Sequence, residues 1–171
     1  MIIKEKTVEA MNTQIASEFT ASAQYIAIAV YLDEEGLPDL ANFFYRQSEE
    51  EREHAMKFVR FMLEAGAKPT IPAVPKLRNE FSSVADAVEF ALEQEKHVTR
   101  QIDDLVSIAQ TEGDHTSHNF LQWFVTEQVE EVSSMTALLQ TIKHAGGALL
   151  LVEDYVRRHL ATGGSEAPTN A

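Results

Sequence analysis

Apolar residues recur at alternating steps of three and four positions along four long segments of this chain. This spacing is typical of α-helices that bury one face in a bundle. The alternation of apolar and polar residues that marks β-strands is missing, so the pattern predicts an all-α protein. The four helices are expected over about Thr7–Glu34, Pro38–Ala65, Ser83–Thr111 and Asp114–Gly146.

The connections between these segments predict how the helices are arranged. Gly36 and Pro38 make a tight break after the first helix, and Gly66 ends the second. Residues 67–82 contain three prolines and are expected to form an extended connection. A short turn at Gly113 links the third helix to the fourth. Two helical hairpins joined by one long crossover form a four-helix bundle.

A short fifth helix is expected over about Leu149–Leu160. Its apolar start is followed at once by acidic residues, so we expect it to contact other subunits rather than a membrane surface. A chain of 171 residues suits one domain. We place this domain at residues 1–161 and a C-terminal tail at 162–171.

Polar side chains interrupt the apolar stripe of every long helix. The first and third helices carry one glutamate each, whereas the second and fourth carry two polar residues three positions apart, on one helix face. Glu18 and Glu51 are 33 positions apart, as are Glu95 and Gln128. Each polar residue of the first helix pair lies 77 positions before its counterpart in the second pair. These residues are Glu18, Glu51, His54, Glu95, Gln128 and Glu131.

Carboxylates at these interior positions need neutralisation. Burying one unpaired carboxylate costs on the order of several kcal/mol, and four together would rival the roughly 5–15 kcal/mol net stability of a typical domain. No lysine or arginine lies on the four stripes, whereas two divalent metal ions would cancel four carboxylate charges. Mixed carboxylate and imidazole ligands favour iron or manganese, with zinc left open.

The overall composition narrows the choice of partners. Acidic residues outnumber basic ones by 27 to 14, and the net charge of -13 favours cations over nucleic acid or an anionic membrane. The absence of cysteine excludes thiolate metal sites, iron–sulfur clusters and disulfides. No secretory signal or membrane-spanning stretch is recognisable, so we expect a cytoplasmic protein.

Taken together, several motifs resemble those of the prokaryotic non-haem ferritins over nearly the whole chain. Glu18 lies in the sequence Ser-Glu-Phe-Thr-Ala, residues 51–54 read Glu-Arg-Glu-His, and residues 122–131 combine Gln-Trp-Phe with Glu-Gln-Val-Glu-Glu. The resemblance implies a ferritin-like bundle and an iron-storage subunit with ferroxidase activity. Such a subunit oxidises Fe(II) with dioxygen and stores a ferric oxyhydroxide mineral in a hollow cage of 24 copies.

The resemblance also implies a role for each interior polar residue. One iron is held by Glu18, Glu51 and His54, and a second by Glu51, Glu95 and Glu131, with Glu51 as the bridge. Gln128 lies beside the site, and Tyr25 hydrogen-bonds or donates an electron nearby. A third and looser iron position is implied near Glu50, Glu127 and Glu130.

One position departs from the generic di-iron bundle, in which both helix pairs carry Glu-x-x-His. Here the second pair reads Gln128-x-x-Glu131. Bacterioferritins have histidine at that last position and a haem-ligating methionine where this chain has Arg52, so we expect no haem. Two other functions stay open: a peroxide-reducing bundle of the rubrerythrin type, which the absence of cysteine disfavours, and a non-catalytic shell subunit. Dioxygen and peroxide both stay open as oxidants.

Other candidate residues have plainer explanations. Tyr25 is equally well placed for core packing. The acidic runs around Glu50 and Glu127 are typical of solvated helix faces. The five histidines other than His54 lie off the stripes or near turns and are assigned no role. Trp123 is expected to pack or to contact another subunit.

Overall fold

The computed structural model describes residues 1–161, and this part of the chain folds into five α-helices without a β-strand. The all-α prediction is confirmed, and each helix starts and ends within two residues of its expected bounds. The helices are α1 (Glu5–Glu34), α2 (Pro38–Glu64), α3 (Val84–Thr111), α4 (His115–Ala145) and α5 (Leu149–His159). The predicted tail at 162–171 lies outside the described residues.

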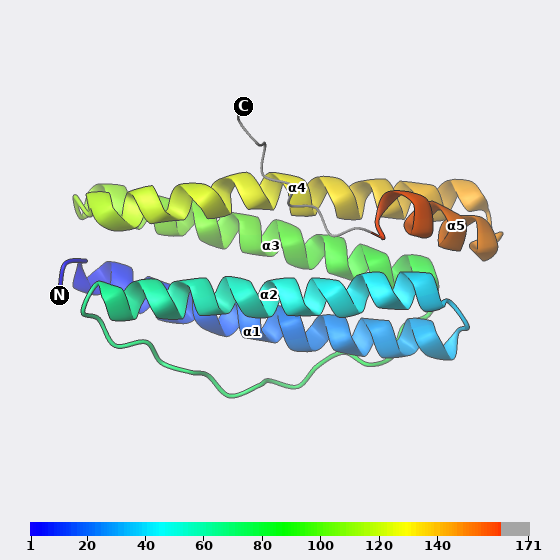
Figure 1. The fold of residues 1–171 in the computed structure, drawn as a ribbon, viewed down its shortest axis with the longest axis horizontal. Helices are drawn as coiled ribbons and strands as arrows, with labels where there is room; N and C mark the ends of the chain where they lie inside the picture. The colour runs from blue at the N-terminus through cyan, green and yellow to red at the C-terminus, as the bar shows by residue number, and fades with distance from the viewer. Residues whose placement is uncertain (162–171) are drawn as a thin grey trace, which may run out of the picture.

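The helices form the predicted bundle of two antiparallel hairpins (Figure 1). Helix α1 packs against α2 and α3, and α3 packs against α4, whereas the backbones of α2 and α4 stay farther apart. The crossover between α2 and α3 runs along the length of the bundle. Helix α5 packs against both α2 and α4. None of the helices in residues 1–161 has the length and apolar composition needed to cross a membrane.

The first three long helices end through the same backbone turn. After α1, Gly36 adopts φ +75°, a left-handed conformation that glycine enters without steric cost. The amide of Leu37 then donates to the carbonyl of Leu32 at 3.0 Å, which satisfies one of the free carbonyls at the helix end. Gly66 and Gly113 end α2 and α3 in the same way. The sequence predictions at these turns are confirmed.

The helix starts are capped by different means. The hydroxyl of Ser83 accepts from the amide of Asp86 at 3.1 Å and caps the start of α3. Helix α2 has no side-chain cap of its own. Instead, the buried carboxylate of Glu153 in α5 accepts from the amide of Leu40 at 3.0 Å. The last helix therefore caps the second and is fixed against it.

The crossover is held against α1 by hydrogen bonds to its backbone. The side-chain amide of Gln24 donates to the carbonyl of Arg78 at 2.7 Å, and its oxygen accepts from the Arg78 amide at 2.9 Å. Farther along, the oxygen of Asn12 accepts from the amide of Thr70 at 2.7 Å. These contacts satisfy backbone groups of a segment that has no regular structure.

The interior consists of two apolar clusters with a polar layer between them. One cluster lies toward α5 and includes Leu32, Phe44, Val88 and Leu138. The other lies toward the N-terminus and includes Ile15, Phe58, Leu105 and Phe124. Along every long helix, the polar residues predicted from the sequence fall between the residues of the two clusters. The bundle thus positions a polar site at its mid-length.

Candidate metal centre

Each of the four long helices places its interior polar residues in the layer between the apolar clusters. All six are buried, with no more than 5% of any of them exposed. The structure therefore brings together the set expected from the sequence: Glu18 from α1, Glu51 and His54 from α2, Glu95 from α3, and Gln128 and Glu131 from α4.

Glu18, Glu51 and His54 form a compact group in this layer. Their ligand atoms lie within 4.8 Å of one another, and Nδ1 of His54 is 3.2 Å from Oε2 of Glu51. The amide of Gln14 donates to Oε1 of Glu18 at 2.8 Å and fixes that carboxylate. The other oxygen of Glu18 is buried without a hydrogen-bond partner. A metal ion would satisfy this oxygen, so the residues present fit a cation.

Glu95 is held by hydrogen bonds from two neighbours. The hydroxyl of Tyr25 donates to one of its oxygens, and the side-chain amide of Gln128 donates to the other at 3.3 Å. Gln128 also donates to the Glu95 carbonyl and to the hydroxyl of Thr99, each at 3.2 Å. The structure thus places Tyr25 and Gln128 beside Glu95, where both can orient a metal-binding carboxylate.

Glu131 forms a second group with His54 and Glu127. The ligand atoms of this second group also lie within 4.8 Å of one another, and Nε2 of His54 is 3.9 Å from Glu127. The two ring nitrogens of His54 therefore approach different carboxylates, Glu51 on one side and Glu127 on the other.

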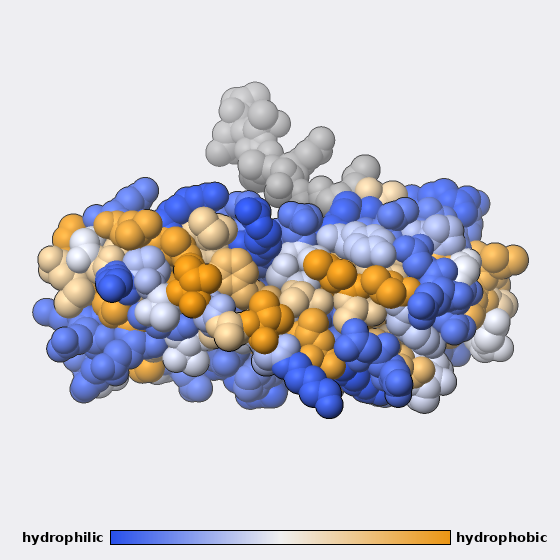
Figure 2. Space-filling model, turned by 90° about the horizontal axis from the view of Figure 1, so that it is seen from below, coloured by the Kyte–Doolittle hydropathy of each residue, from blue (hydrophilic) through white to orange (hydrophobic). Residues whose placement is uncertain are grey.

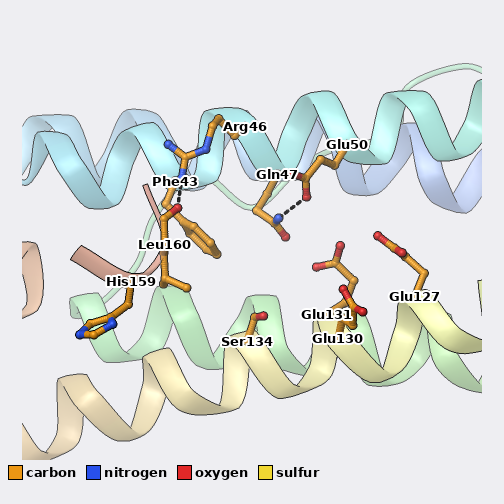
Figure 3. Close-up of a pocket in the computed structure, with 10 residues that line it drawn as sticks. All are labelled: Phe43, Arg46, Gln47, Glu50, Glu127, Glu130, Glu131, Ser134, His159 and Leu160. Carbon is orange, nitrogen blue, oxygen red and sulfur yellow. Dashed lines mark hydrogen bonds between the residues drawn. The ribbon is translucent and has the colours of Figure 1, made fainter. Parts of the chain in front are cut away.

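The three residues predicted for a looser iron position line a cavity of about 210 Å³ between α2 and α4. Figure 3 shows Glu127 and Glu131 extending from α4 toward α2, which contributes Gln47 and Glu50. The amide of Gln47 donates to Glu50 at 2.5 Å, while its oxygen is buried without a partner. Glu130, the third predicted residue, is exposed at the cavity. The cavity joins the buried layer to the bundle surface.

Burial and mutual repulsion raise the pKa values of the interior carboxyls. Burial, and then the neighbouring Glu95, raises the pKa of Glu131 to about 9. Burial raises the pKa of Glu18 to about 7, although hydrogen bonds with Glu51 and Gln14 oppose the shift. Burial and three adjacent carboxylates raise the pKa of Glu51 well above its ordinary value. The pKa of Glu95 is raised by burial. Without a metal, these shifts favour the protonated forms of the carboxyls.

The histidine shifts in the opposite direction. Burial, with a smaller contribution from Lys57, lowers the pKa of His54 to about 4. Its imidazole is therefore neutral at physiological pH and has a lone pair for a metal. No lysine or arginine is buried among residues 1–161, so no basic side chain can neutralise the acidic layer from within. The arrangement is suited to binding cations through oxygen and one nitrogen.

Comparison with known proteins identifies the family. Residues 8–145 match the ferritin-like domain family. The chain belongs to the ferritin family. It is 48% identical to Ferritin BfrB of Mycolicibacterium smegmatis over 156 residues, which covers 91% of this chain and 86% of that protein. It is 35% identical to a bacterial non-heme ferritin of Staphylococcus aureus over 155 residues, 89% of this chain and 93% of that protein.

Solved ferritin structures agree with this assignment. An open-pore ferritin from the hyperthermophilic archaeon Archaeoglobus fulgidus superposes on this ferritin-family chain with a TM-score of 0.88 at 37% identity. The match covers 91% of this chain and 96% of that one. A humanized archaeal ferritin gives a TM-score of 0.89 at 34% identity, over 95% of this chain and 98% of that one. The resemblance to prokaryotic ferritins and the ferritin-like fold are confirmed.

Three polar residues of this ferritin-family site were not predicted from the sequence. Gln14 and Thr99 each lie one helical turn from a predicted glutamate, and this spacing could have identified them. Gln47 likewise lies one helical turn before Glu51 in α2. The five other histidines occur in neither ligand group among the described residues.

Proposed function

We propose that this chain is the subunit of an iron-storage ferritin that oxidises Fe(II) at a two-metal centre inside its bundle. The ferric product is stored as an oxyhydroxide mineral in the hollow interior of a cage of identical subunits. The family assignment supports iron storage, and the buried acidic layer supports oxidation at this position.

One observation carries the proposal: four glutamates from four helices are buried together without a buried basic partner in residues 1–161. Their raised pKa values favour the protonated forms in the metal-free protein, and these protons can be exchanged for metal ions. A layer with no binding role would be easier to stabilise with apolar side chains.

The chemistry follows from the ligand type. Carboxylates are hard oxygen ligands that stabilise Fe(III) more than Fe(II), and so favour the loss of an electron from each bound ion. Two Fe(II) ions supply two electrons, and the acceptor, dioxygen or hydrogen peroxide, takes up two protons. The protein holds the ions together and supplies negative charge.

We assign the ligands from the neighbours of each carboxylate. Glu18, Glu51 and His54 hold one iron, as their compact grouping suggests. Glu51 bridges to a second iron held with Glu95 and Glu131, because its carboxyl interacts with both Glu18 and Glu95. Tyr25 and Gln128 orient Glu95 through their hydrogen bonds.

A third and weaker iron position is proposed in the cavity lined by Glu50, Glu127 and Glu130. Burial and a neighbouring carboxylate raise the pKa values of Glu50 and Glu127, which indicates that their charges are not neutralised by the protein. This cavity gives iron a path between the buried layer and the bundle surface.

Assembly into a cage, with 24 copies as the resemblance implies, is supported by apolar side chains left on the surface. Figure 2 shows an extended apolar patch on the face formed by α1 and the crossover. These elements expose Ile26, Val30, Ile71 and Val74. Helix α5 exposes Leu150 at 80% and Leu151 at 65%. Contact with other subunits would bury these side chains.

The experiment that tests the function is aerobic oxidation of Fe(II) by the metal-free protein, followed by near-ultraviolet absorbance. Glu18→Ala and His54→Ala should each oxidise Fe(II) about tenfold more slowly or worse, because each removes a direct ligand. Glu34→Ala, which removes an exposed glutamate from the same helix as Glu18, serves as the control. Equal rates in all four proteins would defeat the catalytic proposal.

Sedimentation of the same proteins tests storage separately. The variants and the wild type should sediment as the same large assembly, because none of the substitutions is at an exposed apolar residue. A monomer or dimer under all conditions would defeat the cage proposal and leave the metal centre untouched.

A further inference from the structure

A second hollow between α2 and α4, of about 330 Å³, lies beside the proposed metal centre but contains none of its ligands. Its lining is largely aromatic, with Phe61 from α2 and Phe120, Trp123 and Phe124 from α4. The backbones of α2 and α4 are the more widely spaced neighbours of the bundle, and large rings fill the gap.

The rings that line the hollow pack closely against one another. Those of Phe61 and Phe120 stack in parallel with centroids 3.9 Å apart, and Trp123 meets Phe124 edge-on at 4.9 Å. Trp123 is nevertheless 41% exposed. A large aromatic side chain left open in a concave surface is characteristic of binding sites for ligands with an apolar ring.

The side chains around the hollow are mainly basic, although the chain as a whole is acidic. Two cations, Lys57 and Arg60, line it against one acid, Glu64, whereas the whole chain has a net charge of -13. Nζ of Lys57 lies 4.2 Å from the centre of the Trp123 ring. Arg60 makes only an exposed 3.4 Å pair with Glu53, a kind of contact that contributes little and exchanges easily.

We propose that this hollow binds a planar aromatic anion. Its ring lies against Trp123, and its negative group is held by Lys57 and Arg60. The ring of Trp123 also packs edge-on against the imidazole of His54, with centroids 5.4 Å apart. The indole of Trp123 therefore lies between the bound ligand and His54 of the proposed metal centre. The site itself does not depend on the iron chemistry.

The test uses flavin mononucleotide as the probe, because it combines a flat ring system with a phosphate. Titration of this probe with metal-free assembled protein should give saturable quenching of flavin fluorescence, since stacking on an indole quenches it. Riboflavin, which has the same ring without the phosphate, should bind about tenfold more weakly, and rising salt should remove the difference.

Substitutions test the aromatic part and the cationic part of the site separately. Trp123→Leu and the double variant Lys57→Gln with Arg60→Gln should each weaken binding of the probe about tenfold. Lys143→Gln, an exposed cation on α4 outside the hollow, should bind as the wild type does. Circular dichroism and sedimentation of each variant verify that fold and assembly are retained.

Two results would overturn the proposal. One is the absence of saturable binding, or equal binding by the double variant and Lys143→Gln. The other is a hollow that solvent cannot reach in the assembled protein. Trp123 is the only tryptophan in the chain, so quenching of its emission by iodide reports directly on the exposure of this face. Protection from iodide in the assembled protein would show that another subunit covers the hollow.

Discussion

Loading the metal centre at neutral pH should expel protons, because the buried carboxyls hold them in the metal-free protein. The pKa of Glu131 is raised to about 9, so this carboxyl is protonated at pH 7, and the raised pKa of Glu51 favours its protonated form. Glu18, with a pKa of about 7, is half protonated. The pKa of His54 is about 4, and it contributes no proton. Binding of two divalent ions should therefore release at least about one to two protons per subunit.

The assay is a pH-stat titration with Co(II) or Zn(II) in the absence of oxygen, so that no redox reaction consumes or releases protons. The number released should fall as the pH is raised from 7 to 9, because Glu18 and then Glu131 have already lost their protons. Glu131→Gln should release about one proton fewer than the wild type at pH 7. Glu34→Gln, which changes an exposed carboxylate, should release the same number as the wild type.

Release of fewer than about one proton per subunit at pH 7 would refute the reasoning. It would mean that the carboxylates are already ionised in the metal-free protein, and that burial without a basic partner does not control their charge. An unchanged number for Glu131→Gln would remove that residue from the set that binds metal.

Three further predictions concern stability. Ionisation of Glu131 is disfavoured in the fold, so the metal-free protein loses stability as the pH rises from about 4.5 toward 9. Glu131→Gln should therefore have a higher melting temperature than the wild type at pH 9, and the difference should vanish near pH 4.5. An equal difference in melting temperature at both pH values would contradict this. Glu153→Ala removes the cap on Leu40 and should lower the free energy of unfolding in urea by about 1 kcal/mol, whereas Glu153→Gln keeps an acceptor oxygen and should lose less. Gly36→Ala forces a side chain into φ +75° and should cost about 1–2 kcal/mol by thermal melting, whereas Gly36→Asn, which tolerates this conformation, should cost less.

The fold was predictable because its determinants are local. The three-and-four spacing of apolar residues specifies helices, and glycines such as Gly36 and Gly66 end them within a few residues. The prolines of residues 67–82 exclude a helix there, which leaves one long crossover and the observed topology. The interior glutamates were predictable for the same reason, since a helical stripe shows which positions point inward.

The remaining features depend on side-chain direction and on partners that are distant in the sequence. Nothing in the spacing of Glu95 shows that it accepts hydrogen bonds from Tyr25, 70 positions away. Nor does the spacing of Glu131 show that it approaches both His54 and Glu127. The cap that Glu153 provides to α2 joins residues 113 positions apart. Such contacts follow from how the helices pack, and no local pattern encodes them.

The division of the interior into two apolar clusters makes the middle of the bundle its weakest cross-section. Each cluster draws on all four long helices, so each end of the bundle is cohesive by itself. In the metal-free protein the layer between the two ends consists of buried polar side chains instead of apolar packing, and backbone amides in the central turns should exchange with deuterium faster than those at either end. Metal ligation from four helices would bind the ends into one cooperative unit, so a subunit carrying iron is also one that resists opening.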